Sequence, residues 1–408
     1  MKKIRYITSL LIGGSLLLNS CDSFKEVTDV SEVQPLTTIV KANLNLGSAP
    51  TPDKLTVKFI NYNDRFELNG IMNASGEISV SGVLPGIYTV TILGEMVHEG
   101  FTYNYSGNAV NIAIVKDQAT INISVGAAKS GAIIFKEIFY CGSRTLSGGS
   151  YFRDQFYELY NNSTEVQYLD GLSLCVIAPL TATADLPIWP SPYDKDYVFS
   201  TILWSIPGSG SSYPLQPGES VIIAQMADNH KKETLNPGSP VNLLSAEFET
   251  LIQTTALIGD NPAINMEITY YPGSRTPQYL TTVFGGGYVL FKPSQPIDPN
   301  FHVSYIGSTA LHSPILIENV LDAVEAVNTP NHVQLKRMPS VLDAGAVTVN
   351  GTYNNTSIAR KIKETLPNGR IVFCDTNNSS EDFETFNPPV ARRYNPGIPA
   401  WNTWKDLQ

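Results

Sequence analysis

Two glutamates lie in apolar surroundings of the kind that general acid–base catalysis can use. Glu137 and Glu158 each lie in an apolar, strand-like string of residues, and paired carboxylates in unlike environments can divide the acid and base roles. No further catalytic partner accompanies them in the sequence. A carboxylate in a strand more simply caps a loop or accepts backbone N–H bonds, so the pattern favours a structural role over catalysis.

An acidic loop near the C-terminus offers the oxygen atoms that calcium prefers. Asp375, Asn377, Ser379 and Glu381 alternate along it, so four side-chain oxygens could converge as in the first half of an EF-type loop. The glycine that the sharp turn needs is missing, and Phe386 stands where such a loop has its bidentate glutamate. The four residues are therefore calcium candidates, and Asx-turn capping of the final strand is the alternative.

The histidines lack the local spacing of a zinc site. None of them forms an H-x-x-x-H or H-E-x-x-H motif or lies beside a cysteine pair; they are His98, His230, His302, His312 and His332. Distant ligands could still meet after folding, and His302 and His312, with Tyr305 between them, are the first to follow. We predict no cofactor and, the calcium candidates apart, no metal.

Three cysteines follow Cys21, namely Cys141, Cys175 and Cys374. An odd number allows at most one disulfide among them, and the sequence does not say which pair would form it. The alternative is three buried thiols that pack as small apolar groups.

Aromatic residues in loops rich in proline and glycine are the remaining binding candidates. Loop aromatics are common anchors for glycans and protein partners. The alternative is that these loops pack down on the core. The candidates are Trp189, Tyr193, Trp204, Tyr270 and Tyr271.

The start of the chain has the features of an export signal. Lys2, Lys3 and Arg5 precede the uncharged apolar run Tyr6–Leu18, which has the length of a signal-peptide core and is too short to span a bilayer. The run ends Leu18-Asn19-Ser20-Cys21, which resembles the bacterial lipobox. The resemblance implies cleavage before Cys21 and acyl chains on its thiol, which would hold the protein on a membrane.

The residues after Cys21 are polar and lack periodicity. We predict a signal peptide over residues 1–20 and a flexible tether over residues 21–36. The charged residues that follow the anchor are similar to the surface-export signals of some Gram-negative lipoproteins. This favours an outer-membrane lipoprotein at the cell surface, and the periplasmic leaflet is the alternative.

The composition argues against nucleic acid as a partner. A chain cleaved before Cys21 keeps 24 basic residues against 37 acidic ones. Binding a polyanion draws on clustered lysine and arginine, and the basic residues here form only short pairs such as Arg392 and Arg393. The acidity most simply serves solubility.

The elements that must position these side chains are mainly strands. From Thr37 onward apolar residues alternate with polar ones, as at Leu55, Val57 and Phe59, and turn residues separate the runs. About seven short strands within residues 37–126 predict a small β-sandwich. Gly82, Leu84, Pro85, Gly86 and Tyr88 in this segment resemble the transthyretin-like fold of carboxypeptidase regulatory domains, which implies a spacer or binding module.

A second unit is predicted over residues 131–385, with a C-terminal tail over residues 386–408. Its strings resemble the lamin-tail domain, an immunoglobulin-like sandwich; they are Ala132–Ile138, Phe156–Ser163, Leu169–Leu174, Leu215–Ala224, Ser357–Arg360, Gly369–Arg370 and Asp375–Phe383. The match departs from that family over about residues 225–340, which predicts an inserted subdomain or lid. In this segment Gly285–Gly287 predicts a hinge before a buried strand, and the apolar spacing of Ala310–Val327 predicts a short helix.

The overall organisation looks like a family of uncharacterised bacterial outer-membrane lipoproteins. We expect a mostly β protein with two sandwiches in tandem, the second with a large insertion. The expected function is a non-catalytic surface lipoprotein that acts as a binding or scaffold module, accessory to an outer-membrane TonB-dependent transporter or binding a glycan or protein. The alternatives are a metal-dependent hydrolase whose site is built from the insertion, and a structural spacer in a surface adhesive assembly.

Overall fold

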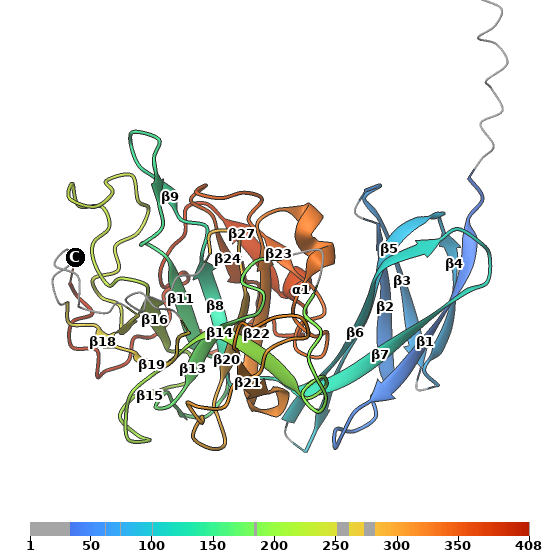
Figure 1. Ribbon diagram of the computed structural model, residues 1–408, viewed down its shortest axis with the longest axis horizontal. Helices are drawn as coiled ribbons and strands as arrows, with labels where there is room; N and C mark the ends of the chain where they lie inside the picture. The colour runs from blue at the N-terminus through green and yellow to red at the C-terminus, as the bar shows by residue number, and fades with distance from the viewer. Residues whose placement is uncertain are drawn as a thin grey trace, which may run out of the picture.

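The computed structural model describes residues 33–407 except residues 62, 74, 100, 183–185, 251–260 and 273–281. The expected signal peptide (1–20), the lipidation site Cys21 and tether residues 21–32 lie outside the described residues. The expected mostly β fold, with two β-sandwiches in tandem, is confirmed (Figure 1). No helix among the described residues is long and apolar enough to cross a bilayer.

The first sandwich is a seven-stranded sheet with the order β3-β2-β5-β6-β7-β1-β4. The sheet curls until its edge strands lie together, since a Cβ on Gly70 of β3 would lie 2.8 Å from Ile78 Cδ1 of β4. Alternation explains the strands: Leu55, Val57 and Phe59 are buried between outward polar residues. The strands are β1 Leu36–Asn45, β2 Lys54–Asn61, β3 Phe66–Asn73, β4 Glu77–Val83, β5 Gly86–His98, β6 Phe101–Ile114 and β7 Ala119–Lys129.

The second sandwich packs two larger sheets face to face. The β8 sheet has the order β18-β17-β16-β11-β8-β24-β27, and the β13 sheet has the order β19-β14-β13-β20-β22-β23 with β21 paired to β14. The β8 sheet consists of β8 Ile133–Phe139, β11 Phe156–Asn161, β16 Ser220–Ala224, β17 Phe248–Glu249, β18 Ile264–Asn265, β24 Ser357–Arg360 and β27 Phe383–Phe386. The β13 sheet consists of β13 Ser173–Ile177, β14 Tyr197–Ser205, β19 Glu267–Tyr270, β20 Gly287–Phe291, β21 Ser313–Leu316, β22 Val320–Val327 and β23 Val347–Thr348.

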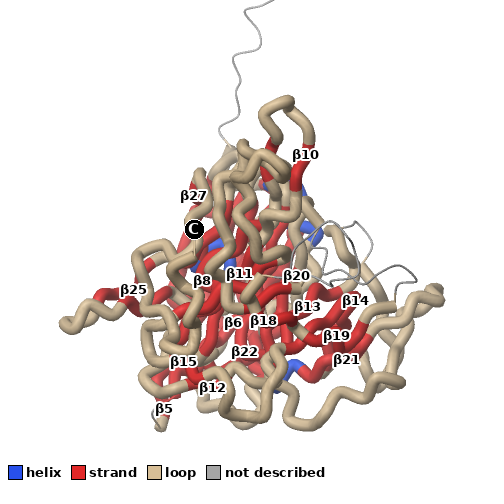
Figure 2. Tube along the Cα trace, turned by 90° about the vertical axis from the view of Figure 1, so that its left-hand side faces the viewer, coloured by secondary structure: helices blue, strands red, loops and turns tan. Residues whose placement is uncertain are grey.

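Short elements complete this unit. They are β9 Ser143–Arg144, β10 Ser150–Tyr151, β12 Gln167–Tyr168, β15 Pro214–Leu215, β25 Ile362–Thr365, β26 Ile371–Phe373, the 3-10 helices Ile317–Asn319 and Pro330–Leu335, and the single-turn helix α1 Ser379–Asp382. The β25–β26 hairpin projects from the body of the sandwich (Figure 2), and every residue of β25 is exposed.

The described parts of residues 225–340, a segment expected as an inserted subdomain or lid, are built into the sandwich. β20 and β22 occupy central places in the β13 sheet, and β17 and β18 extend the β8 sheet. The core between the sheets depends on them, because Tyr288, Leu290 and Val324 lie in it beside Tyr157 and Trp204. The segment therefore forms part of the hydrophobic core instead of standing apart from it.

The helix predicted within Ala310–Val327 is wrong. The segment forms β21, one short 3-10 turn and β22. β22 is covered on both faces, so its apolar residues form a nearly continuous run, and such a run cannot be told from a helix by periodicity alone. The buried strand predicted after Gly285–Gly287 is present as β20.

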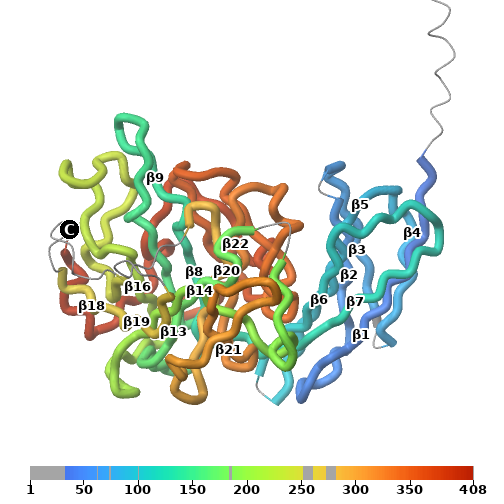
Figure 3. The backbone as a smooth tube through the Cα atoms, viewed as in Figure 1, coloured from blue at the N-terminus to red at the C-terminus, as the bar shows by residue number. Residues whose placement is uncertain are grey.

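The two sandwiches meet along a polar row on β6. Asn104 Nδ2 donates to the Asp375 carbonyl at 2.8 Å, Ser106 Oγ to the Ser340 carbonyl at 2.6 Å, and Asn108 Nδ2 to the Ala344 carbonyl at 2.7 Å. Residues two apart in a strand share a face, so one face of β6 donates hydrogen bonds to backbone carbonyls of the second sandwich. β7 leads directly into that sandwich (Figure 3).

Candidate functional site

The carboxylates Glu137 and Glu158 lie opposite each other on β8 and β11, and both are fully buried. Glu137 accepts from Ser357 Oγ at 2.5 Å, from the Val390 amide and from Arg393 Nε at 2.8 Å. These contacts use the carboxylate to hold other segments of the chain. Contacts of this kind are those that the structural interpretation of the sequence expects.

A β-bulge places Lys136 beside the same pair. Glu137 faces Glu158 and Phe135 faces Leu159, so Lys136 is the extra residue of β8. A bulge re-aims a side chain, and here the Lys136 ammonium lies 2.7 Å from Glu158 Oε1 with almost no exposed surface. Burial lowers the pKa of Lys136, while Glu158 acts in the opposite direction.

The C-terminal segment, residues 386–407, covers the outer face of the β8 sheet over these charges. The Arg392 amide donates to Glu158 at 3.1 Å, and the Arg392 guanidinium pairs with the buried Glu247 at 2.5 Å. Asn402 is also buried, and Trp401 packs on the core. Residues expected only as a tail thus satisfy the buried carboxylates of the sheet.

The calcium candidates have four different protein partners. Asp375 Oδ1 lies 3.4 Å from Arg360 Nη1, Asn377 Nδ2 donates to the Val341 carbonyl, Ser379 Oγ donates to Asp343 Oδ2, and Glu381 Oε1 lies 2.6 Å from Lys58 Nζ. The loop caps the short helix α1, as Asn378 accepts from the Ser380 amide. In the structure this loop supplies part of the contact between the two sandwiches, through the Asp375 carbonyl and Glu381.

The histidines and cysteines are dispersed. Among the residues that the structure describes, no three His, Cys, Asp or Glu side chains gather as a metal site. His230 is buried against Tyr151, with Nδ1 2.8 Å from its hydroxyl, and burial lowers its pKa to about 4. Cys141, Cys175 and Cys374 are free thiols, and burial raises the pKa of Cys175 to about 12.

The aromatic candidates separate into core and surface residues. Trp204 is fully buried between the sheets, and Tyr270 is buried beside the tilted ring of His302, with centroids 4.5 Å apart. Tyr271 is half-buried against the core. Trp189 and Tyr193 are also half-buried, and both lie in a loop outside the sheets.

Trp189 and Tyr193 belong to a cluster at one edge of the β13 sheet. The Trp189 ring stacks on Phe199 with centroids 3.5 Å apart and meets Tyr305 edge-on at 5.6 Å. Tyr193 lies 5.6 Å from Phe301. We name this cluster the aromatic surface and define it as Ile188, Trp189, Tyr193, Phe301, Tyr305 and Ile306.

Two loops hold the aromatic surface together. The Ile306 amide donates to the Ile188 carbonyl at 2.9 Å, and Val303 and His312 exchange two backbone hydrogen bonds. The rigid arrangement nevertheless leaves large aliphatic side chains in water, since Ile188 is 69% and Ile306 66% exposed. A cavity of about 280 Å³ lined by Tyr197, Phe301, Pro293 and Pro296 adjoins it.

A second concave site escaped the sequence reasoning. It is a cavity of about 340 Å³ on the β8 side, lined by Lys136, Tyr160, Arg370, Phe373 and residues of the C-terminal segment. Lys136 and Arg370 had been read only as parts of strand strings, and Arg393 as half of a short basic pair. Lys136 is far from Arg370 and Tyr394 in sequence, so only folding brings them together.

Taken with the fold, these sites define a class: a two-sandwich β protein that presents a rigid aromatic surface and a charged cavity from its second unit. The chain belongs to the DUF4876 family, a protein family of unknown function, whose model matches residues 216–390. A DUF4876 family protein from Bacteroides thetaiotaomicron VPI-5482, solved by crystallography at 2.50 Å, is 40% identical, with 90% of this chain and 99% of that chain covered and a TM-score of 0.65.

Other comparisons add little. A "putative adhesin" from Bacteroides ovatus ATCC 8483 is 10% identical, with 70% of this chain and 82% of that chain covered and a TM-score of 0.18. A "putative cell adhesion protein" from Bacteroides eggerthii DSM 20697 is 8% identical, with 69% and 78% covered and a TM-score of 0.18. Such low scores carry no inference about this chain. No curated protein matches it.

Proposed function

We propose that the chain is a non-catalytic, membrane-anchored surface lipoprotein that binds an outer-membrane protein through the aromatic surface. The observation that carries the proposal is the exposure of Ile188 and Ile306 on a platform of stacked rings. Exposed apolar side chains that cluster on a rigid support mark an interaction site more often than scattered ones do.

The chemistry of the surface favours a protein partner over a glycan. Isoleucine side chains offer no hydrogen bonds to sugar hydroxyls, but they fill apolar pockets on a protein. Aromatic anchors such as Trp189 and Tyr193 lose little conformational freedom on binding, because Phe199 and Phe301 already hold their rings. The surface is therefore built for apolar protein contact.

The anchor at Cys21 supports an outer-membrane partner. Acyl chains there would confine the chain to the membrane surface, and the tether after Cys21 would let the sandwiches reach a neighbouring receptor. Confinement raises the effective concentration of a partner in the same membrane, so that a small apolar surface suffices for binding. An outer-membrane transporter of the TonB-dependent type is the partner that we propose.

The two domain resemblances belong to the same proposal. Transthyretin-like and lamin-tail-like modules are chiefly scaffolds, and this use fits a first sandwich that spaces the second from the membrane. The row Asn104, Ser106 and Asn108 would keep that spacer in a fixed orientation, because each side chain bonds a backbone carbonyl of the second sandwich.

The test measures binding of the acylated full chain to outer-membrane vesicles that contain or lack a TonB-dependent transporter. We expect saturable binding to vesicles with the transporter, and at least a tenfold weaker affinity for the double variant Ile188→Asp, Ile306→Asp. The control is Ile71→Asp, since Ile71 is 73% exposed in the first sandwich. Equal binding by the double variant would refute the proposal.

The anchor needs its own measurement. Mass spectrometry of the protein from membranes should show an N-terminal Cys21 with acyl chains, and Cys21→Ser should release the protein from the membrane fraction. An unmodified N-terminus upstream of Cys21 would contradict the anchored version of the function.

A further inference from the structure

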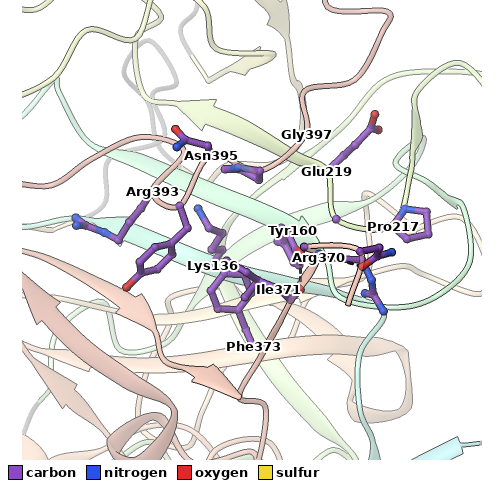
Figure 4. A pocket seen from close by; sticks show the side chains of 15 residues that line it. Lys136, Tyr160, Pro217, Glu219, Arg370, Ile371, Phe373, Arg393, Asn395 and Gly397 are labelled. Carbon is purple, nitrogen blue, oxygen red and sulfur yellow. Dashed lines mark hydrogen bonds between the residues drawn. The ribbon is translucent and has the colours of Figure 1, made fainter. Parts of the chain in front are cut away.

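The cavity on the β8 side has an unusual combination of lining groups. Its volume is about 340 Å³, which lies within the range of small-molecule sites. Figure 4 shows Lys136 and Arg370 on either side of Tyr160, with Phe373 below and the Asn395–Gly397 segment above. Three cations, Lys136, Arg370 and Arg393, thus share a cavity with the carboxylate Glu219 and with aromatic walls.

The cations of the cavity are not equally neutralised. Arg393 is held by Glu137 at 2.8 Å. Lys136 gives one hydrogen bond to Glu158, so two of its three N–H donors have no partner among the described residues. The Arg370 guanidinium donates only to the carbonyls of Asn162 and Ser163 and has no carboxylate partner in the described part of the chain.

The guanidinium of Arg370 is the cation of this cavity that a negatively charged group can pair with. Lys136 and Arg393 form ion pairs with Glu158 and Glu137. Glu219, the carboxylate in the lining, accepts from the Gln216 amide at 2.8 Å and makes no ion pair with Arg370. A planar guanidinium binds a carboxylate with particular strength, because two N–H groups can point at its two oxygens. Anion binding here would also use the free donors of Lys136.

The other lining groups suit a ring with hydroxyl groups. Tyr394 lines the cavity and is 41% exposed, with its ring 6.3 Å from that of Phe373, while Tyr160 and Phe373 meet edge-on at 4.9 Å. The amides of Asn368 and Asn395 reach the rim. Amide side chains both donate and accept hydrogen bonds, as sugar hydroxyls require.

The rim is held in a costly backbone conformation. Arg392, Tyr394 and Asn395 have φ of 60°, 66° and 51°, values that non-glycine residues rarely adopt and that recur at ligand sites. Backbone bonds fix the segment, since the Ser220 amide donates to the Gly397 carbonyl and the Gly397 amide to the Gly218 carbonyl. These bonds therefore fix the backbone of the segment that carries Tyr394 and Asn395 along the cavity.

We propose that this cavity binds a hexuronic acid unit of an acidic saccharide. The carboxylate lies against Arg370 and Lys136, the pyranose ring stacks on Tyr394, and Asn368 and Asn395 bond its hydroxyls. The many hydrogen-bonding groups at the rim favour a polyhydroxylated ligand over a peptide C-terminus. The site is independent of the aromatic surface, which belongs to the edge of the other sheet.

Calorimetric titration of the full chain tests the proposal. The probes are trisaccharides of galacturonic acid and of glucuronic acid, and the methyl ester of each serves as its uncharged match. We expect binding of at least one acid, weakened by salt, and binding of its ester at least about tenfold weaker. An acetylated tripeptide with a free C-terminus should not bind.

Variants locate the site. Arg370→Gln removes the charge without breaking an ion pair, so the fold should persist, and the affinity for the acid should fall at least about tenfold. Tyr394→Ala should weaken it severalfold, and Arg65→Gln, an exposed change in the first sandwich, should leave it unchanged. Equal binding of acid and ester, preference for the tripeptide, no binding of either acid, or an unaffected Arg370→Gln would each overturn the proposal.

Discussion

The two sandwiches differ in how they use charge. Every charged side chain that is buried among the described residues belongs to the second sandwich, including Lys136, Arg337 and Arg360 with their carboxylate partners. The first sandwich buries only neutral polar groups, such as Thr38, Asn104 and Ser106, beside its apolar core. The same architecture is thus stabilised in two ways.

The difference reflects the length of the strands. In the first sandwich long strands pair along most of their length, and alternation alone buries a core. The second has many two- to five-residue strands joined by long loops. Backbone groups in buried loops need partners, and the buried carboxylates supply them, as Glu325 does for the amides of Arg337 and Met338.

The largest expected effect comes from removing the central cation of the second sandwich. Arg360 is buried and lies within 2.7–3.4 Å of Asp322, Asp375 and Asp382. Arg360→Met should lower the free energy of unfolding by about 3–5 kcal/mol, because it leaves buried carboxylates without their counter-charge. Urea unfolding measures this.

The control for that variant is Arg65→Met, an exposed change in the first sandwich, which should stay within about 0.5 kcal/mol of the parent. Equal decreases in the free energy of unfolding for the two variants would contradict the proposed difference between the sandwiches.

The next effect is a pH dependence that belongs to the second sandwich. Burial raises the pKa of Asp154 to about 6, although Ser143 and Ser239 donate hydrogen bonds that lower it. Because this folded-state pKa is above the unfolded value, the carboxyl contributes stability below about pH 4 that is lost as the pH rises through 6. In the parent chain this carboxyl lowers the free energy of unfolding by about 1–3 kcal/mol between pH 4 and pH 7. Asp154→Asn should abolish that decrease, because the amide does not titrate.

Urea unfolding at pH 4.5 and pH 7 checks this. The difference between the two pH values should shrink in Asp154→Asn and stay unchanged in Asp53→Asn, an exposed change in the first sandwich. A parallel shift of both pH points in the Asp154 variant would show that this carboxyl does not titrate as described.

We expect a smaller loss in the free energy of unfolding when the contact between the sandwiches is weakened. Asn104→Ala removes the donor to the Asp375 carbonyl, which stays buried, so we expect a loss of about 1–2 kcal/mol. Amide hydrogens should exchange faster in both β6 and the 375–381 loop. Asn43→Ala, on the exposed side of β1, should leave the exchange rates of both segments unchanged. Faster exchange in β6 alone would show that the bond does not link the two sandwiches.

The smallest effect is expected in the core of the first sandwich. Ile92→Val removes one buried methylene from β5 and should cost about 0.5–1.5 kcal/mol. The loss should be the same at pH 4.5 and pH 7, since no buried charge lies in that core. A loss that varies with pH would contradict the division between the two sandwiches.

The sequence predicted the first sandwich well because alternation is a local signal. Leu55, Val57 and Phe59 mark an inner face before any partner is known. The second sandwich was predicted only in part. Strands such as β22 are buried on both faces, so their pattern resembles a helix, and two-residue strands such as β17 leave no periodic signal at all.

The sequence predicted only those site residues whose neighbours in the chain indicate a surface loop. Trp189 and Tyr193 were found because they lie in proline-rich loops, yet Trp204 and Tyr270 come from similar sequence and are buried. The cavity with Arg370 depends on a bulge at Lys136 and on left-handed residues at Arg392 and Tyr394. Neither feature has a local sequence signature.

The central claim is that the second sandwich supplies the binding surface of an anchored module. Photo-crosslinking in intact cells, with the probe residue at Ile188 or at Ile71, tests this most directly. The account predicts one crosslinked outer-membrane protein at position 188, lost when Ile306→Asp is added, and none at position 71. The same products at both positions, or none at 188 with the protein at the cell surface, would contradict it.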